Sequence, residues 1–483
     1  MSGFSAKGGR FKRRMAVMLD GEEVQIQSGL SERQIPGKIG DIEKIDGGSS
    51  TSLPPYEKDV VTQCVDPFGN EDSAEVKYKV LTWWQCGLLM IAETMSLGIL
   101  ALPSAVAALG LVPAIIILLF IGFLATYTGY TIGQFKAAYP HVHSMADAGE
   151  ILMGRFGREL LGVGQLLFLI FIMGSHVLTF VVMMNTLTDN GTCSIVFGLV
   201  GMLVSLILTL PRTLKNVSWL SIISFASIFS AVMITMIAVG VQKPGDGIDA
   251  FVTTDIYHAF LAVSNIIFSY SGHVAFFGFA SELKNPSDYS KALFTLQGTN
   301  TTFYTIAGVV IYYFAGREVA SPALSSTGPL ISKIAYGVAC PTIVIAGVIN
   351  GHVACKYLYV RIFRGTDHMS RRNWTSIGAW VGLATLLWVI AWIIAEAIPV
   401  FNHLLSLITA LFASWFTFGL NGWFWLYLNK GRYFSSPRKI VLTLLNVFCV
   451  ASGALICGLG LYVSGRAINE DTTSAGSFTC SRM

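Results

Sequence analysis

The sequence predicts an all-α polytopic membrane protein, and three observations carry that prediction. Charged residues make up 12% of the 483 positions and hydrophobic residues 53%, whereas an ordinary soluble domain is about 25% charged. After residue 80, apolar runs of about 20 residues, the length that a transmembrane helix needs, alternate with short polar links. Two of these runs carry small polar interruptions near the middle, which is typical of membrane folds built from inverted repeats.

Residues 1–80 precede the first apolar run and differ from the rest of the chain. They contain 11 of the 32 Lys and Arg residues and 13 of the 28 Asp and Glu residues, with few large apolar side chains. This composition predicts a disordered tail. The net charge of the whole chain is only +4, so we expect no nucleic acid as a partner.

Eleven transmembrane helices are expected within a single membrane domain at 81–465. Spans 1 to 5 would form one repeat at 83–240, spans 6 to 10 an inverted second repeat at 257–428, and span 11 an additional helix. The expected spans are 83–109, 111–134, 161–185, 194–210, 218–240, 257–281, 293–316, 329–354, 375–397, 402–428 and 437–465.

The distribution of Lys and Arg predicts the orientation of these helices. Links on the side of the N-terminal tail hold 16 basic residues, and segments on the other side hold 5. Basic residues concentrate on the cytoplasmic side of membrane proteins, so the tail is expected to be cytoplasmic. An odd number of spans then makes 466–483 a short extracellular tail. Cys193 and Cys480 would both lie outside, which allows a disulfide between them without requiring one.

Two acidic residues fall inside the expected spans. Glu93 is the eleventh residue of the first span, which places it about 15 Å deep in a hydrocarbon core of about 30 Å. A charge at that depth is costly and marks function by default; the alternative is a protonated, hydrogen-bonded core residue. Glu396 lies at the outer end of span 9 and can reach water. His176, in span 3, is expected to be structural.

The first and sixth spans are both expected to break near the midplane. Their centres read Glu93-Thr-Met-Ser-Leu-Gly98 and Ser269-Tyr-Ser-Gly-His273. A break frees backbone groups that are tolerated at membrane depth only where they line a cavity. Free N–H groups near Gly98 and Ile99, at the positive end of a half-helix, would suit a carboxylate. Carbonyls around Phe268–Ser271 would suit an ammonium group, and the pair predicts an amino acid.

The same stretches carry a family resemblance. Ser96-Leu-Gly-Ile-Leu-Ala-Leu-Pro103 resembles the helix 1 signature Gly-Ile-Leu-x-Leu-Pro of the amino acid/auxin permease family, and Phe268-Ser-Tyr-Ser-Gly-His273 resembles its helix 6 break. Trp83-Trp84, Ala92-Glu-Thr-Met-Ser96 and the segment 139–150 look like the filamentous-fungal neutral amino acid permeases of the methyltryptophan-resistance type. The resemblance covers about 65–465 and implies the LeuT-type five-plus-five fold.

This resemblance also implies a function, namely proton-coupled uptake of neutral aliphatic and aromatic L-amino acids across the plasma membrane. The partners would be the amino acid, protons and the lipid bilayer. Glu93 is the expected proton carrier, and His273 is its rival. Carried over position by position, the substrate site would comprise Thr94, Met95, Ser96, Leu97, Gly98, Ile99, Phe268, Ser269, Tyr270, Ser271 and Gly272.

Several alternatives stay open at this point. Sodium coupling, a vacuolar location and a non-transporting amino acid receptor each fit the same pattern. The sequence contains no paired carboxylates, nucleophile elbow or cluster with metal-ligand spacing. We therefore expect no enzyme, no catalytic residues, no metal and no cofactor.

Overall fold

A computed structural model describes residues 18–19, 22–23, 78–212, 214–245, 247–363, 366, 368, 373–471, 478 and 480. Two short strands, β1 (Met18–Leu19) and β2 (Glu22–Glu23), pair antiparallel with Met18 opposite Glu23. The tail expected at 1–80 otherwise lies outside the described residues, apart from 78–80, which lead into the first helix.

The rest of the described chain is helical. In chain order the elements are α2 (Trp83–Leu109), α3 (Leu111–Ala138), α4 (Met145–Thr188), α5 (Ser194–Thr209), α6 (Leu214–Gln242), α7 (Ile256–Ser269), α8 (His273–Ser281), η1 (Pro286–Asp288), α9 (Tyr289–Ala315), η2 (Gly316–Glu318), η3 (Ala323–Ser326), α10 (Pro329–Phe363), α11 (Trp374–Ala397), α12 (Phe401–Ile408), the π-helix η5 (Thr409–Gly419), α13 (Leu420–Leu428) and α14 (Pro437–Asp471).

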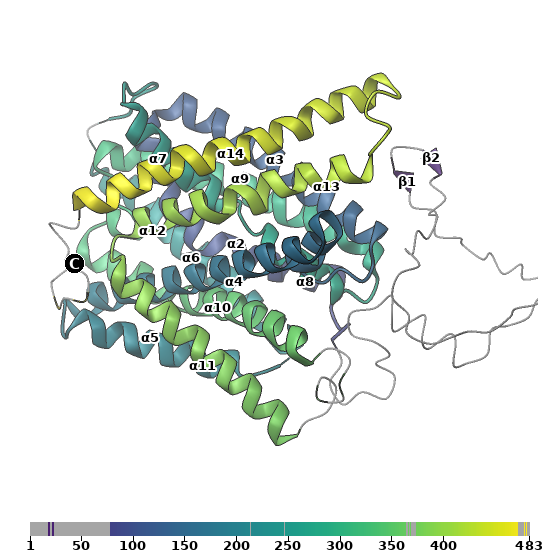
Figure 1. Ribbon diagram of the computed structural model, residues 1–483. Helices are drawn as coiled ribbons and strands as arrows, with labels where there is room; N and C mark the ends of the chain where they lie inside the picture. The colour runs from purple at the N-terminus through teal and green to yellow at the C-terminus, as the bar shows by residue number, and fades with distance from the viewer. Residues whose placement is uncertain are drawn as a thin grey trace, which may run out of the picture.

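These helices form one bundle with α2 near its centre. Figure 1 shows α14 and α13 along one side of the bundle and α5 and α11 along the opposite side. Within its most apolar window, α2 is 89% buried by the protein, against 28% for α11 and for α14. Helix α2 packs on α9, α7 and α6, and α10 packs on α4 and α6. A site on α2 is therefore enclosed by protein and not by lipid.

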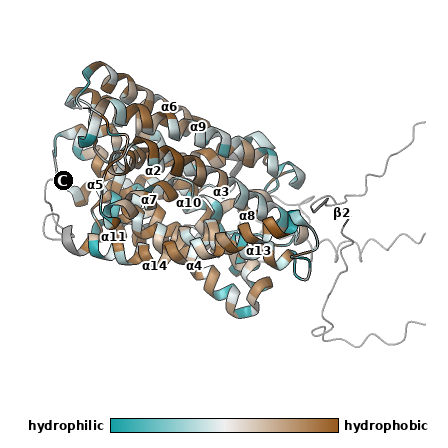
Figure 2. Ribbon diagram, turned by 90° about the horizontal axis from the view of Figure 1, so that it is seen from above, coloured by the Kyte–Doolittle hydropathy of each residue, from teal (hydrophilic) through white to brown (hydrophobic). Residues whose placement is uncertain are grey.

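The described helices have the length and apolarity that the sequence predicts for a polytopic membrane protein. Nine of them could cross a membrane by length and composition, and α5, at 16 residues, is a shorter apolar helix. Figure 2 shows hydrophobic residues along most of the length of α2 and α6. The all-helical membrane fold is confirmed, while the count of eleven spans stays a prediction.

The predicted break in the first span is wrong. Helix α2 runs without interruption from Trp83 to Leu109, and the Thr94 hydroxyl donates to the Met90 carbonyl at 2.9 Å within the helix. Gly98 does not interrupt the helix but allows a close contact with α7. A Cβ at this position would lie 2.6 Å from Ser269 Cα, so glycine allows α2 to cross the end of α7 at close range.

The predicted break in the sixth span is confirmed. Helix α7 ends at Ser269 and α8 begins at His273, with Tyr270, Ser271 and Gly272 between them. The end of α7 tightens, because the N–H groups of Tyr270 and Ser271 bond back only three residues along the chain. The chain thus crosses the region in two half-helices, whose junction lies beside the middle of α2.

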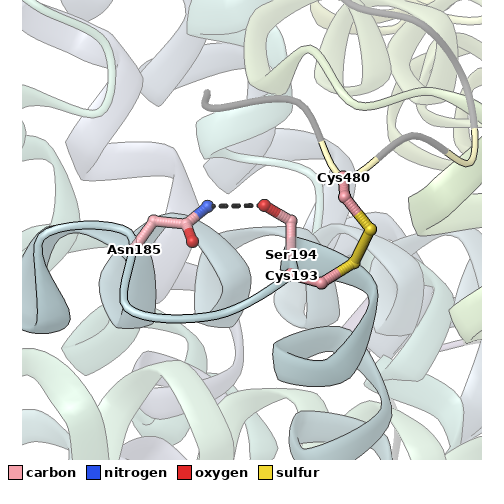
Figure 3. The surroundings of a disulfide bond; sticks show 4 residues. All are labelled: Asn185, Cys193, Ser194 and Cys480. Carbon is pink, nitrogen blue, oxygen red and sulfur yellow. Dashed lines mark hydrogen bonds between the residues drawn. A yellow bond between two sulfur atoms is a disulfide. The ribbon is translucent and has the colours of Figure 1, made fainter.

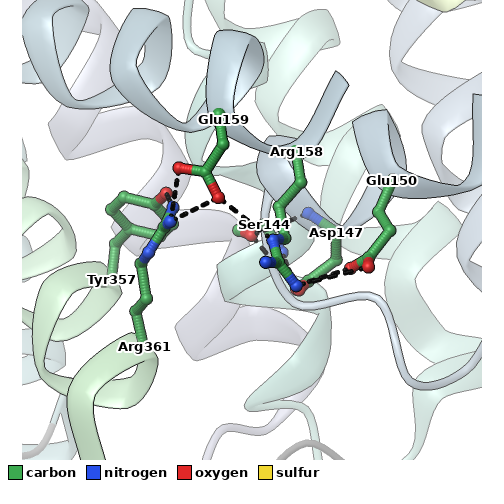
Figure 4. Close-up of polar contacts among 7 residues, drawn as sticks. All are labelled: Ser144, Asp147, Glu150, Arg158, Glu159, Tyr357 and Arg361. Atoms are coloured by element: carbon green, nitrogen blue, oxygen red, sulfur yellow. Dashed lines mark hydrogen bonds and ion pairs between the residues drawn. The ribbon is translucent and has the colours of Figure 1, made fainter. Parts of the chain in front are cut away.

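One end of the bundle is tied by a polar cluster around a kink in α4. The kink is at Gly154, with φ 66° and ψ −151°, a conformation that glycine adopts readily. Arg158, after the kink, contacts Glu150, before it, at 3.3 Å, and Arg361 of α10 binds both oxygens of Glu159 (Figure 4). These exposed pairs fix local geometry more than they add stability.

A disulfide ties the other end. Cys193, which precedes α5, is bonded to Cys480 near the C-terminus, 287 residues later. The bond that the sequence allowed is therefore present. Next to it, Asn185 Nδ2 donates to Ser194 Oγ at 3.0 Å (Figure 3), and the backbone N–H of Phe478 donates to the carbonyl of Glu396. Residues 478 and 480 are thus held next to α11 and α5.

Candidate functional site

A cavity lies where the middle of α2 faces the break between α7 and α8. Its volume is about 20 Å³, which is about the space that one water molecule needs. Three elements supply its walls: α2, α4 and the broken span. The lining residues are Glu93, Thr94, Leu97, Ile172, His176, Phe268, Ser271 and Gly272.

Glu93 is the acidic group of this cavity. Its side chain is 6% exposed, and no group among the described residues hydrogen-bonds to its Oε2 atom. A Cβ at Gly272 would lie 2.6 Å from that oxygen, so the carboxyl group lies directly against the residue that caps α8. A structural core carboxyl would be hydrogen-bonded, and Oε2 has no such bond among the described residues.

Thr94 is held in place from α9. Asn300 Nδ2 donates to the Thr94 hydroxyl at 2.8 Å, and the Tyr304 hydroxyl donates to the Thr94 carbonyl at 3.1 Å. Asn300 and Tyr304 are four residues apart and share a helix face. The ring of Tyr304 also packs edge-on against Tyr270, with ring centroids 5.3 Å apart. Helix α9 therefore positions both the cavity wall on α2 and the break in the sixth span.

The carbonyl groups of the break are less available than the sequence suggests. The Phe268 carbonyl accepts from Ser271 twice, from its hydroxyl at 2.6 Å and from its backbone N–H at 3.0 Å. The Ser269 hydroxyl donates to the Asn265 carbonyl at 3.0 Å. These local bonds leave the hydroxyl oxygen of Ser271 as an acceptor on the cavity wall.

The two histidines near the site differ in what they face. His273 is fully buried, and its Nε2 lies 2.9 Å from the Ala125 carbonyl and 3.1 Å from Thr128 Oγ1, both on α3. His176 instead lines the cavity, and its Nδ1 lies 2.8 Å from the Ile343 carbonyl. A carbonyl only accepts, so Nδ1 carries the proton and Nε2 of the neutral ring is an acceptor.

The structure brings six of the predicted site residues to the cavity wall: Glu93, Thr94, Leu97, Phe268, Ser271 and Gly272. The others lie close by with different contacts. Gly98 and Ser269 form the crossing of α2 and α7, Tyr270 packs on Tyr304, and His273 faces α3. Met95, Ser96 and Ile99 are buried on α2 away from the lining.

Sequence reasoning missed three residues. His176 was expected to be structural, and nothing in a single helix shows which face meets the cavity. Asn300 and Tyr304 lie in a span that also contains Gln297 and five threonines, so the sequence does not single them out. Among the described residues, no group of three His, Cys, Asp or Glu side chains could hold a metal ion.

Comparison with known proteins places this architecture in a family. Residues 79–465 match the family model for the transmembrane amino acid transporter protein. The N amino acid transport system protein of Neurospora crassa is 39% identical over 401 residues, 80% of this chain and 85% of that protein. A transmembrane transporter of Gibberella moniliformis is 30% identical over 78% of this chain and 83% of its own length.

The fold has a counterpart among solved structures. A substrate-bound, outward-open Na⁺-coupled sialic acid symporter matches with a TM-score of 0.52 and 10% sequence identity, over 83% of this chain and 96% of that one. This likeness shows the LeuT-type fold alone. Together with the family match over most of its length, it identifies the chain as a member of the transmembrane amino acid transporter family, a family of permeases and not of enzymes.

Proposed function

We propose that this permease is a secondary active transporter that imports neutral aliphatic and aromatic amino acids by proton symport. The observation that carries the proposal is Glu93, a buried acid on the wall of a cavity at the middle of the bundle, whose Oε2 accepts no hydrogen bond from the described residues. An ionisable residue within a membrane span marks an ion or proton pathway by default.

One proton per amino acid is sufficient for accumulation. A single charge that moves through 100 mV releases about 2.3 kcal/mol. Since about 1.4 kcal/mol corresponds to a tenfold ratio, this supports roughly fiftyfold accumulation before any pH gradient is added. Glu93 is the one carboxyl group of the cavity lining, so it is the group proposed to take up and release that proton.

The rest of the cavity supports a neutral substrate. Leu97, Ile172 and Phe268 contribute apolar wall, and Glu93 is the one Asp, Glu, Lys or Arg side chain of the lining. An anionic side chain would therefore have no cationic partner in the lining, and a cationic one would have only Glu93, the group proposed to carry the proton; a buried charge without a partner is costly. A neutral side chain carries no such cost.

Uptake into proteoliposomes tests the proposal. With an inside-negative potential and an acidic exterior, the wild-type protein should accumulate labelled leucine, and Glu93→Gln should lose accumulation but retain leucine–leucine exchange. Glu396→Gln is the matched control, because Glu396 is also 6% exposed but lies at the end of α11 and does not line the cavity. It should accumulate leucine normally. Full accumulation by Glu93→Gln would overturn the role of Glu93.

Two further measurements decide between the remaining alternatives. Accumulation that disappears when sodium is replaced by choline would favour sodium coupling, and absence of any leucine exchange would favour a receptor.

The proposed location is the plasma membrane, with a cytoplasmic N-terminus and an extracellular C-terminus. The Lys and Arg distribution and the Cys193–Cys480 disulfide, which needs an oxidising side, support it. Fluorescent tagging in the source cells separates it from the vacuole.

A further inference from the structure

We infer that the N-terminus of α8 is a single carboxylate site that Glu93 and the substrate occupy in turn. In the ionised form, Glu93 holds this site itself. In the protonated form it releases the site to the carboxylate of the amino acid. This inference rests on the proposed proton symport and adds the physical step that links the proton to the substrate.

The first part of the argument is the start of α8. This helix has nine residues, His273–Ser281, and Gly272 caps it. The first N–H groups of a helix have no acceptor inside it, and together they form the positive end of the helix dipole. Such a terminus binds carboxylates and phosphates. Because α2 is unbroken, its N–H groups at Gly98 and Ile99 are used within the helix, and the carboxylate position expected there is lost.

The second part is the position of the Glu93 side chain. Its Oε2 lies so close to Gly272 that a Cβ there would come within 2.6 Å, and the Thr94 methyl group would be 2.3 Å away. Oε2 has no hydrogen-bond partner among the described residues, and Glu93 is only 6% exposed. An unpartnered buried acid thus points at the start of a helix, and glycine at position 272 makes room for it.

The third part is the character of the other polar groups on the cavity wall. The Nε2 atom of His176 and the hydroxyl oxygens of Thr94 and Ser271 are acceptors, since their donor groups are already used within the protein. Acceptors suit the ammonium group of an amino acid and repel its carboxylate. The start of α8 is therefore the donor group that the substrate carboxylate requires.

No other charged group described near Glu93 could bind the substrate carboxylate in place of the start of α8. Among the described residues, His176 of α4 lines the cavity with Glu93, and Tyr304 of α9 lies close enough to interact with it electrostatically. At the break, Tyr270 packs on Tyr304 and His273 faces α3. On α10, Lys356 pairs with Glu282 and Lys333 pairs with Asp189, both away from the cavity lining. Two carboxylates at one helix start repel each other, so one of them must be protonated or absent.

The proposal predicts the sign of the linkage between proton and substrate. Binding of leucine displaces a neutral Glu93, so each leucine bound should take up as much as one proton from solution. Leucine affinity should then fall by up to tenfold per pH unit once Glu93 ionises. A rival arrangement, in which ionised Glu93 binds the substrate ammonium directly, predicts the opposite sign, with tighter binding at higher pH.

The experiment measures leucine binding to the purified full-length protein from pH 5.5 to 8.5, with proton uptake recorded by calorimetry in buffers of different ionisation enthalpy. The wild-type protein and Glu396→Gln should show affinity that falls with pH and uptake of a proton. Glu93→Gln should bind leucine with a pH-independent affinity and no proton uptake. Tighter leucine binding at higher pH, or proton uptake retained in Glu93→Gln, would overturn the inference.

Leucinol isolates the role of the substrate carboxylate, because it keeps the ammonium group and side chain of leucine but has no carboxylate. As a competitor of leucine, it should gain relative to leucine by the same factor by which the leucine affinity of the wild-type protein falls between pH 5.5 and 8.5. A ratio that stays constant while the leucine affinity falls, or no leucinol binding at pH 8.5, would contradict the inference. Proton-driven accumulation of leucine would still stand in that case, so the symport proposal and the shared carboxylate site fail separately.

Discussion

At the scale of single residues, Gly98 sets the distance between α2 and the broken span. A Cβ there would lie 2.6 Å from Ser269 Cα and 2.8 Å from its Cβ, and a backbone atom at that distance cannot move without its helix. The wall of the cavity on α2 and its wall at the break are thus positioned by one contact. A change of a single methyl group at this contact alters the whole site.

We therefore expect Gly98→Ala to destabilise the protein by about 1–3 kcal/mol, the usual range for overpacking, and to reduce leucine uptake. Thermal unfolding in detergent and proteoliposome uptake measure the two effects. Gly278→Ala is the matched control, since it lies on α8 of the same broken span and a Cβ there would meet nothing within 4 Å. An unfolding midpoint for Gly98→Ala equal to that of Gly278→Ala would contradict this account.

A functional residue can be predicted from the sequence where a charged side chain lies within an apolar membrane span. Glu93 stands out because an acid at mid-depth needs a reason, and the structure places it on the cavity wall. His176 and Asn300 do not stand out in the same way. Their roles depend on which face of α4 or α9 meets α2, and that is decided by packing between helices far apart in the chain.

At the scale of elements, a buried ion pair joins the end of α8 to α10. Glu282 and Lys356 are 1% and 4% exposed and in direct contact. The strand-like segment before α2 is bound to the same place, because the Leu81 N–H donates to the Glu282 carbonyl at 3.0 Å. Lys356 also lies 4.8 Å from the ring centre of Tyr78, and burial raises the pKa of Tyr78 to about 12, so this ring stays neutral at physiological pH.

Loss of one partner of this pair should be worse than loss of both. Lys356→Met leaves the Glu282 carboxylate buried without its cation, which we expect to destabilise the protein by about 3–5 kcal/mol. The double variant Lys356→Met/Glu282→Gln should recover most of that loss, because no charge remains buried. Thermal unfolding of the two single variants and the double variant forms the cycle that measures it. Additive losses would show that the two residues act independently.

The elements themselves were predictable to different degrees. The sequence predicts the break in the sixth span because its centre, Ser269-Tyr-Ser-Gly-His273, is polar and contains glycine. The break in the first span was predicted on a similar pattern and is absent. Gly98 has two uses that a sequence does not distinguish, a helix interruption and a close helix crossing, and only the position of Ser269 decides between them.

At the scale of the whole molecule, the disulfide places two distant segments on one side of the membrane. Cys193 follows α4 and Cys480 follows α14, so an even number of crossings separates them. This agrees with the orientation that the Lys and Arg distribution predicts. The bond also closes a loop that contains most of the second half of the chain, and it thereby restricts the unfolded state.

A membrane-impermeant maleimide tests this arrangement on intact cells. We expect no labelling of the wild-type protein before reduction, labelling after mild reduction, and immediate labelling of Cys193 in Cys480→Ser. The free cysteines of the described chain, namely Cys86, Cys340, Cys355, Cys449 and Cys457, lie within the helices and should stay unlabelled. With the opposite orientation, Cys64 of the N-terminal tail would be outside, so labelling of the wild-type protein before reduction would contradict the arrangement.

Because α2 is unbroken, a tilt of this helix moves its two ends in opposite directions. With 27 residues at about 1.5 Å each, it is a rod of roughly 40 Å. A tilt of about 10° around its centre would move each tip by roughly 3.5 Å in opposite directions. When α2 tilts, one of its ends moves away from the neighbouring helices at one membrane surface while the other end moves toward them at the opposite surface. In the proposed transport cycle, the stiffness of this helix would keep the site from opening to both sides at once, with the pivot where Gly98 touches Ser269.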